Sequence, residues 1–199
     1  PSKKEFDRIM TEGASWCVRH GIGWNEDLER TEEGGCFQGA DPSCVSARAR
    51  ERGVRQVGSL GSGNHYLEIQ TVRPGDIFDT PRAVQFGITM PDQVVVMLHC
   101  GSRGLGHQIA GDYCTRFLDV MRSRYALSVP DRQLACAPFR SHEGQEYFAA
   151  MKCAVNMAFA NRQALAHRIR EVFGTVMKKD PVQLGMHQVY DVTHNTAKL

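Results

Sequence analysis

The stretch GSLGSGNHYLEIQ, residues 58–70, decides how this chain is organised around its candidate site. Its three glycines let the backbone adopt positive φ and bring N–H groups close to an anion. His65 then precedes a predicted strand over residues 66–72, in which Glu68 points to one face because side chains alternate along a strand. Two interpretations stay open for this stretch alone: a metal or nucleotide site, or a tight turn with a hydrogen-bonded histidine.

A second glycine-rich turn follows a second predicted strand. The apolar run VVVML, residues 94–98, predicts a buried strand. It leads into HCGSRGLG, residues 99–106, and then into a predicted helix that reaches about Tyr125. A glycine turn between a strand and a helix N-terminus attracts anions. Neither turn matches the Walker A or the dinucleotide-binding pattern, so both of those classes are excluded.

The composition indicates an ordinary globular protein. The chain has 199 residues, 42% hydrophobic and 23% charged, which is enough for one sizeable domain. A formal net charge of +2 does not exclude nucleic acid, because a local basic face can bind phosphates. No run of about 18 apolar residues occurs, so the sequence predicts no membrane-spanning helix.

The cysteines predict a reducing compartment. There are seven, an odd number, at irregular spacings and without a CxxC pair. This usage is typical of free thiols and not of a disulfide framework. We therefore expect a cytoplasmic protein, or a nuclear one if the source is eukaryotic.

The rest of the chain predicts mixed helix and strand. Helices are expected over residues 3–20, 42–52 and 143–173, and a last strand over residues 187–192. The arginines of the 42–52 helix and its exit form either a solvated face or a phosphate-contacting surface. Three polar residues lie among apolar and small residues of the long helix: Asn156, Asn161 and Arg162. They are expected either to be satisfied polar groups in a site wall or to occupy exposed positions.

Three histidines share one local context. His65, His99 and His194 each stand at the start or end of a predicted strand, beside Gly, Asn or Cys. Loops at strand ends are where sites are usually built, and three imidazoles can bind Zn, Mn, Fe, Co or Ni. The residues alone leave a metal site and structural histidines as equal alternatives. The other histidines are expected on the surface or on helix faces: His20, His107, His142, His167 and His187.

Five longer motifs carry a family resemblance. They are GSLGSGNHYLEIQ, MLHCGSRGLGHQ, DRQLACAP, EGQEYFAAMKCAVNMAFANRQ and VYDVTHNTAK, in this order along the chain. Together they closely resemble the central part of the RtcB family of RNA ligases, the tRNA-splicing ligases. The resemblance covers nearly the whole chain, including ADPSCVSARARERG at residues 40–53.

The resemblance implies a GTP- and Mn²⁺-dependent ligase. Such an enzyme joins RNA ending in a 3′-phosphate or 2′,3′-cyclic phosphate to RNA with a 5′-hydroxyl. A family histidine is first guanylylated, GMP passes to the RNA 3′-phosphate, and the 5′-hydroxyl attacks that activated end. The implied partners are tRNA exon halves or broken RNA ends, and an archease-type activator.

The resemblance also implies roles for individual residues. His65 is expected to bind one Mn²⁺, and His99 and His194 the other. Arg103 is expected to contact RNA or phosphate, with Arg52 as a further candidate. The implied guanylate-pocket residues are Asn64, Tyr66, Glu68 and Asn195. Two metal ions suit this chemistry because they neutralise phosphate charge and align nucleophile and leaving group.

The resemblance further implies an α+β fold with stacked β-sheets at the core and flanking helices, of which residues 1–199 are a single-domain central portion. The family's Asp/Cys metal motif, similar to DVGCG, and its guanylylated histidine are expected before and after this chain, which would leave the chain alone inactive. Two other classes stay open: a metal- or nucleotide-binding module without catalysis, and a metal-dependent phosphoesterase that uses a histidine-bound water.

Overall fold

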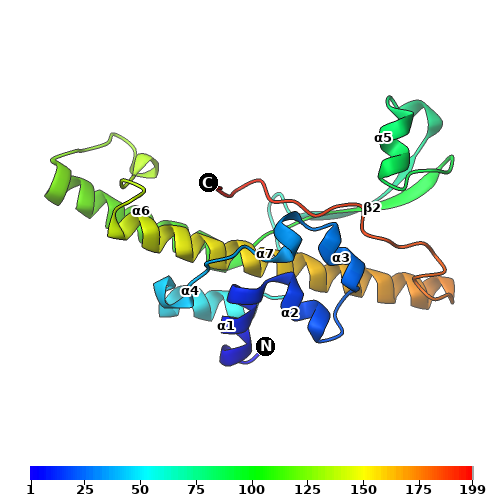
Figure 1. Cartoon of the computed structure of the whole chain (residues 1–199), viewed down its shortest axis with the longest axis horizontal. Coiled ribbons are helices and arrows are strands. Elements are labelled where there is room, and N and C mark those ends of the chain that lie inside the picture. Colours follow the sequence, from blue (N-terminus) through cyan, green and yellow to red (C-terminus); the bar gives the residue numbers. More distant parts are fainter. Residues whose placement is uncertain (199) are drawn as a thin grey trace.

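A computed structural model describes residues 1–198, and a long central helix organises them. This helix, α7 (His142–Met177), runs through the middle of the molecule, and α6 (Arg103–Tyr125) packs against it (Figure 1). The predicted helices over 143–173 and up to Tyr125 are thus confirmed within a few residues. Ser141 caps α7 by accepting a hydrogen bond from the Gly144 N–H at 3.1 Å.

Two short helices, not one, open the chain. α1 (Lys3–Glu12) and α2 (Ala14–Arg19) are separated by Gly13, which has φ +58°. A Cβ at Gly13 would lie 2.1 Å from the Gly35 carbonyl oxygen, so only glycine allows this close approach. The prediction of one helix over residues 3–20 is wrong for this reason.

The region between α2 and the first strand contains α3 (Asn25–Glu29), the 3-10 turns η1 (Glu32–Gly35) and η2 (Pro42–Cys44), and α4 (Ala47–Val54). The single helix predicted over residues 42–52 is divided because two residues cap separately. Asp41 accepts from the Ser43 N–H at 2.8 Å at η2, and Ser46 accepts from the Ala49 N–H at 3.2 Å at α4.

The described residues contain one two-stranded antiparallel sheet. β1 (Tyr66–Val72), where the strand was predicted, pairs with β2 (Gln93–His99), and Tyr66 lies opposite His99. The 3-10 turn η3 (Pro74–Asp76) and α5 (Thr80–Gln85) connect them. β2 was expected to be buried, but Val94 and Met97 are 55% and 42% exposed. An apolar run predicts burial only where other elements cover the strand, and these two side chains, on opposite faces of β2, stay exposed.

The hydrophobic core is helical. Its buried side chains come from α1, α2, η2–α4, α6 and α7: Phe6, Ile9, Met10, Trp16, Cys17, Val45, Ala49, Leu105, Ile109, Tyr113, Phe117, Ala150, Cys153, Ala154, Met157 and Ala160. The mixed helix and strand content agrees with an α+β class. The stacked sheets expected at the core are absent from residues 1–198, where helices occupy that place.

The segment after α7 forms no paired β-strand within the described residues. No strand forms at residues 187–192, so that prediction is wrong; Asp191 makes only an isolated bridge to Thr31. The Asp191 N–H donates to the Arg30 carbonyl at 2.9 Å, and the Glu32 N–H donates to the Asp191 carbonyl at 2.8 Å. In Figure 1 this segment runs above α7 while α1 and α2 lie below it.

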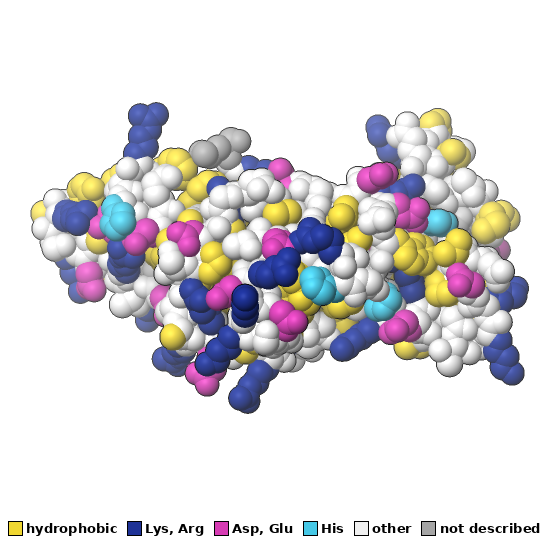
Figure 2. Space-filling model, turned by 60° about the horizontal axis from the view of Figure 1, so that its bottom comes forward, with side chains coloured by type: hydrophobic (Ala, Val, Ile, Leu, Met, Phe, Trp, Pro, Cys, Tyr) yellow, Lys and Arg dark blue, Asp and Glu magenta, His cyan; other side chains and the backbone are white. Residues whose placement is uncertain are grey.

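Charges are mixed on the face that Figure 2 presents, where Lys and Arg side chains gather toward the middle with acidic side chains among them. Arg50 of α4 has a structural role, because it donates to Asp7 at 2.8 Å and to the Val45 carbonyl at 3.2 Å. Arg48 and Arg55 are exposed. Within residues 1–198, neither α7 nor any other helix has the length and apolarity that crossing a membrane requires.

Candidate histidine site

The three histidines singled out in the sequence lie together. The ring centroids of His65 and His99 are 6.2 Å apart, and those of His99 and His194 are 5.0 Å apart. His65 directly precedes β1 and His99 ends β2, so the strand register brings them side by side. His194 arrives on the extended segment after α7. The three histidines that share one sequence context therefore lie near one another.

Asn161 of α7 joins the two glycine-rich turns. Its side chain is fully buried. The Oδ1 atom accepts from the Gly58 N–H at 2.7 Å and from the Ser59 N–H at 3.0 Å. Its Nδ2 donates to the Ser59 carbonyl and to the Gly101 carbonyl, both at 3.0 Å. One carboxamide therefore holds the turn before His65 and the turn after His99 against the same point of α7.

Arg162, the next residue, joins the second turn to the C-terminal segment. Its Nε donates to Asp191 Oδ1 at 2.6 Å and its Nη1 to the Cys100 carbonyl at 3.2 Å. Asp191 precedes His194 by three residues, and Cys100 follows His99. The interpretation as a satisfied polar group in a site wall is confirmed for Asn161. Arg162 is also in the wall, but its Nη2 has no acceptor among residues 1–198, and the exposed alternative is wrong for both.

Arg103 contacts His65 directly. Its Nη1 lies 2.9 Å from His65 Nδ1, and its Nε donates to Ser59 Oγ at 3.3 Å. A guanidinium only donates, so His65 Nδ1 is the acceptor. Burial, together with the charges of Arg103 and His99, lowers the pKa of His65 and favours the neutral imidazole. Arg103 itself has φ +55°, a strained value of the kind that clusters at functional sites.

Gly61 makes this contact possible. A Cβ at residue 61 would lie 1.7 Å from Arg103 Nη1 and 2.5 Å from His65 Nδ1, and its φ of +110° also favours glycine. The glycine is thus required both by the backbone conformation and by the arginine that packs over it.

The other predicted site residues are less closely joined. The Tyr66 ring lies 5.3 Å from the His99 ring, and its hydroxyl donates to Met97 Sδ at 3.3 Å. Glu68 is exposed and accepts from Gln70 at 2.7 Å. Asn64 and Asn195 are exposed beside His65 and His194 in the sequence. Within residues 1–198, no hydrogen bond joins these four candidate guanylate residues to one another.

Arg52 of α4 lies beside the first turns of α6. Its Nη1 donates to Gln108 Oε1 at 2.8 Å. The neighbouring Gln56 accepts from the Gly104 N–H at 2.7 Å, in the first turn of α6. Arg52 therefore flanks the helix that begins with Arg103.

The imidazoles fit part of a metal-ligand set. Residues 1–198 contain no group of three or more His, Cys, Asp or Glu side chains arranged to hold a metal ion. Within the same residues, neither the His99 ring nor the His194 ring has a hydrogen-bond partner, so their nitrogens can accept a metal. Their 5.0 Å centroid separation agrees with the roughly 5 Å that follows when two imidazoles bind one ion at about 2.0–2.1 Å. His65 differs because Arg103 occupies its Nδ1.

Cys100 does not belong to this set. Burial raises the pKa of its thiol to about 11, and its Sγ lies 3.5 Å from Asn161 Nδ2. The thiol of Cys100 therefore lies against α7 at Asn161.

Sequence reasoning missed four contributors: Gln56, Ser59, Arg168 and Asp191. Arg168 Nη1 donates to the Gly58 carbonyl at 2.9 Å. Asn161 and Arg168, seven residues apart on α7, were the available signal, but their partners lie far away in the sequence.

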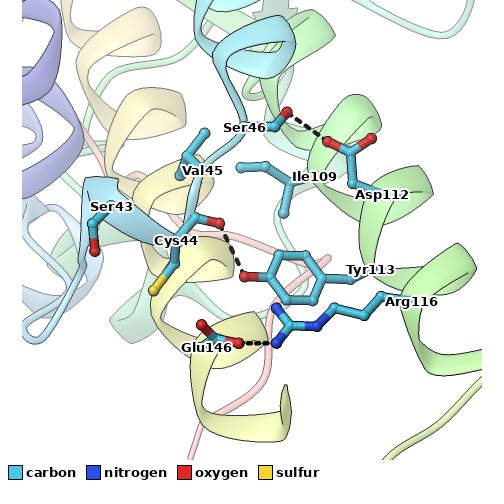
Figure 3. Close-up of a pocket in the computed structure, with 9 residues that line it drawn as sticks. All are labelled: Ser43, Cys44, Val45, Ser46, Ile109, Asp112, Tyr113, Arg116 and Glu146. Carbon is cyan, nitrogen blue, oxygen red and sulfur yellow. Dashed lines mark hydrogen bonds and ion pairs between the residues drawn. The ribbon is translucent and has the colours of Figure 1, made fainter. Parts of the chain in front are cut away.

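A separate cavity of about 260 Å³ lies between η2, α6 and α7. Figure 3 shows that its polar groups bind one another: Ser46 with Asp112, the Tyr113 hydroxyl with the Cys44 carbonyl, and Arg116 with Glu146. No candidate histidine lines this cavity. It is therefore distinct from the histidine site.

Arginine side chains and metal ions are groups that stabilise the charge of a transferring phosphoryl group. Comparison with known proteins gives the family. The family model described as tRNA-splicing ligase RtcB matches residues 1–199, and the chain belongs to the RtcB family.

Individual relatives agree with this family over nearly the whole chain. Identity is 53% over 195 residues to the tRNA-splicing ligase RtcB of Pyrococcus abyssi, covering 98% of this chain and 21% of that protein. It is 51% over 197 residues to the RtcB of Methanococcus maripaludis, covering 99% and 40%. It is 48% over 198 residues to RNA-splicing ligase RtcB homolog 1 of Entamoeba dispar, covering 100% and 36%. The chain thus spans two fifths or less of these relatives.

Proposed function

We propose that this chain supplies the histidine-bearing part of the catalytic centre of an RNA ligase. The ligase would join RNA 3′-phosphate or 2′,3′-cyclic phosphate ends to 5′-hydroxyl ends, using GTP and Mn²⁺. Family membership supports the RNA ligase class, and the observation that carries the proposal is the convergence of His65, His99 and His194. The proposed partners are tRNA exon halves or broken RNA, and an archease-type activator.

Each residue has a proposed role. His99 and His194 would hold one Mn²⁺ together with ligands from elsewhere in a longer protein, and His65 would bind a second ion once its nitrogen is free of Arg103. Bound Mn²⁺ would neutralise phosphate charge and align the reacting oxygens. Arg103 would bind an RNA phosphate, and Arg52 would extend this basic surface along α6. The residues beside the histidines would contact the guanylate: Asn64, Tyr66, Glu68 and Asn195.

A chimera tests the proposal. Residues 1–199 replace the matching segment of the M. maripaludis RtcB, to which the chain is 51% identical. We expect GTP-dependent joining of a 3′-phosphate RNA to a 5′-hydroxyl RNA, lost in His99→Ala and His194→Ala but kept in His107→Ala, an exposed histidine of α6. A folded chimera that cleaves phosphodiesters without GTP would favour the phosphoesterase alternative. One that binds metal and GTP without joining RNA would favour the binding-module alternative.

The isolated chain is proposed to be inactive in guanylyl transfer. Its eight histidines include no counterpart of the family's guanylylated residue, which the resemblance assigns to a later segment. Intact-mass analysis after incubation with GTP and Mn²⁺ is expected to find no GMP adduct. An adduct would make one of these eight histidines the nucleophile and would overturn the assigned roles.

The free cysteines support the proposed cytoplasmic location. All seven are unpaired, and Cys17, Cys100 and Cys153 are buried. Such thiols are usual in a reducing compartment.

A further inference from the structure

We propose that Asn161 and Arg162 are positioning residues, which set the spacing of the three histidines from a single turn of α7. The inference rests on the proposed function, since it concerns the same histidine site. The two residues are adjacent in the sequence, and between them they contact all three histidine-bearing segments.

These segments depend on side chains for their placement. β1 and β2 pair with each other, but the loop before β1 and the turn after β2 lie outside the ladder. The segment of His194 has no regular structure; an isolated bridge attaches it near Asp191, and the Thr193 N–H and hydroxyl donate to Glu32 Oε2. Backbone hydrogen bonds therefore place His99 beside the start of β1 but leave the loop of His65 and the segment of His194 open, and α7 joins all three segments.

Asn161 uses its full hydrogen-bonding capacity on the two turns. A carboxamide offers two donor hydrogens and two acceptor lone pairs. Asn161 accepts from the Gly58 and Ser59 N–H groups and donates to the Ser59 and Gly101 carbonyls. Aspartate has no donors, and alanine has neither kind of group. The separation of His65 from His99 thus depends on this side chain in addition to the strand register.

Arg162 positions the segments that carry His99 and His194, in addition to any contribution it makes to stability. It joins the Cys100 carbonyl to Asp191, so it fixes His194 relative to His99. Its Nη2 is buried without an acceptor among residues 1–198, and an unsatisfied buried donor is destabilising. Arg162 thus holds two segments together although its Nη2 lacks an acceptor. This agrees with a positioning function.

The same helix offers a matched control. Asn156 is also fully buried on α7, and its hydrogen bonds are of the same kind. It accepts from the Phe37 N–H at 2.6 Å and donates to the carbonyls of Met10 at 2.9 Å and Phe37 at 3.1 Å. Those partners carry no histidine of the site. Asn156→Ala therefore removes an equivalent network without touching the histidine segments.

The first readout needs no metal. Nuclear Overhauser effects between histidine ring protons are measured in the wild-type chain, Asn156→Ala, Asn161→Ala and Arg162→Gln, with thermal unfolding recorded for each. We expect His65–His99 and His99–His194 effects in the wild type and in Asn156→Ala. Asn161→Ala should abolish the His65–His99 effect and leave the His99–His194 effect, which Arg162 supports. Arg162→Gln should abolish only the His99–His194 effect, and it provides the test if Asn161→Ala does not fold.

The second readout is Mn²⁺ affinity, followed by electron paramagnetic resonance in the chimera at a temperature where every variant is folded. Loss of outer-sphere support typically weakens metal binding by about 10- to 100-fold, so we expect that loss in Asn161→Ala and Arg162→Gln but not in Asn156→Ala. Arg162→Lys, which keeps the charge, should recover part of the affinity.

Two failures are distinguishable. Overhauser effects that persist between the rings in both Asn161→Ala and Arg162→Gln would overturn the positioning role, whatever the chimera does. If the rings separate in these variants as expected, but the chimera neither binds Mn²⁺ nor joins RNA, the positioning role stands and the proposed function is contradicted.

Discussion

Replacing Asp27 by Asn should destabilise the chain strongly, because it breaks a buried ion pair between α3 and α7. The Asp27 carboxylate is fully buried. It accepts from both terminal nitrogens of Arg170 at 2.6 and 2.7 Å, from Gln163 Nε2 at 2.7 Å and from the Trp24 N–H at 2.9 Å. Arg170 also lies over the Trp24 ring, 3.7 Å from its centroid.

The expected magnitude follows from this burial. Removing one partner of a buried pair costs about 3–5 kcal/mol, because it leaves the other charge uncompensated. For a domain of this size, at about 2–4 °C per kcal/mol, the melting temperature should fall by about 6–20 °C. The effect should extend to the histidine site, because Thr31 donates to the Asp27 carbonyl at 2.7 Å and also bridges to Asp191.

The pH dependence gives a second check. Burial alone would raise the pKa of Asp27, but Arg170, the Trp24 N–H and Gln163 outweigh it and hold the pKa below its usual value of 3.8. Stability from a carboxyl with a lowered folded-state pKa is fully present above the unfolded value and is lost as pH falls through the folded one. The difference in melting temperature between wild type and Asp27→Asn should therefore be constant near neutral pH and shrink below about pH 4.

The assay is thermal unfolding followed by circular dichroism. Asp7→Asn is the matched control, since Asp7 pairs with Arg50 at 2.8 Å at a partly exposed position, where an ion pair contributes only about 0–1 kcal/mol. A decrease for Asp27→Asn no larger than that of Asp7→Asn, or one that grows toward acid pH, would refute the reasoning.

Three further predictions test the site and its surroundings. Gly61→Ala should separate Arg103 from His65, which would change the ¹⁵N chemical shift of the His65 ring. Gly63→Ala is the control: Gly63 has φ +77° and open space around its Cβ position, so this change should strain the backbone only. Equal ring shifts in the two variants would contradict the prediction. Iodoacetamide should label the exposed Cys136 of the native chain well before Cys17, Cys100 and Cys153, because burial raises the pKa of those three thiols to about 12, 11 and 12, with urea-unfolded chain as the control in which all react. Arg103→Gln in the chimera should weaken RNA binding and reduce its salt dependence by about one phosphate contact; an unchanged salt slope would restrict Arg103 to orienting His65.

Local patterns predicted the elements whose ends are determined by their own residues. The glycine turn and the alternation that follows it identify β1 from Tyr66 to Val72, and helical periodicity identifies α6 and α7. The break at Gly13 was missed because its cause is the approach of Gly35, which no local pattern contains. The strand predicted over residues 187–192 did not form because β-propensity needs a partner strand, and Asp191 finds only the turn at Thr31.

The candidate site was predicted in outline. Strand-end context correctly related His65 and His99, which lie beside paired strands, whereas His194 joins them from a segment that forms no strand. The bond between Arg103 and His65 could not be predicted, since it depends on a positive φ at Arg103 and on the absence of a side chain at Gly61. The partners of Asn161 and Arg162 were equally inaccessible, because hydrogen bonds across 29 or more residues leave no local pattern.

The central claim is that the three histidines supply ligands to two metal ions in an RtcB-type ligase. Mn²⁺ stoichiometry of the chimera tests it most directly, measured by electron paramagnetic resonance titration. The account predicts two bound ions in the unaltered chimera, the loss of one ion in His99→Ala and His194→Ala, the loss of the other in His65→Ala, and no loss in His107→Ala. Unchanged stoichiometry in all three site variants would contradict the account.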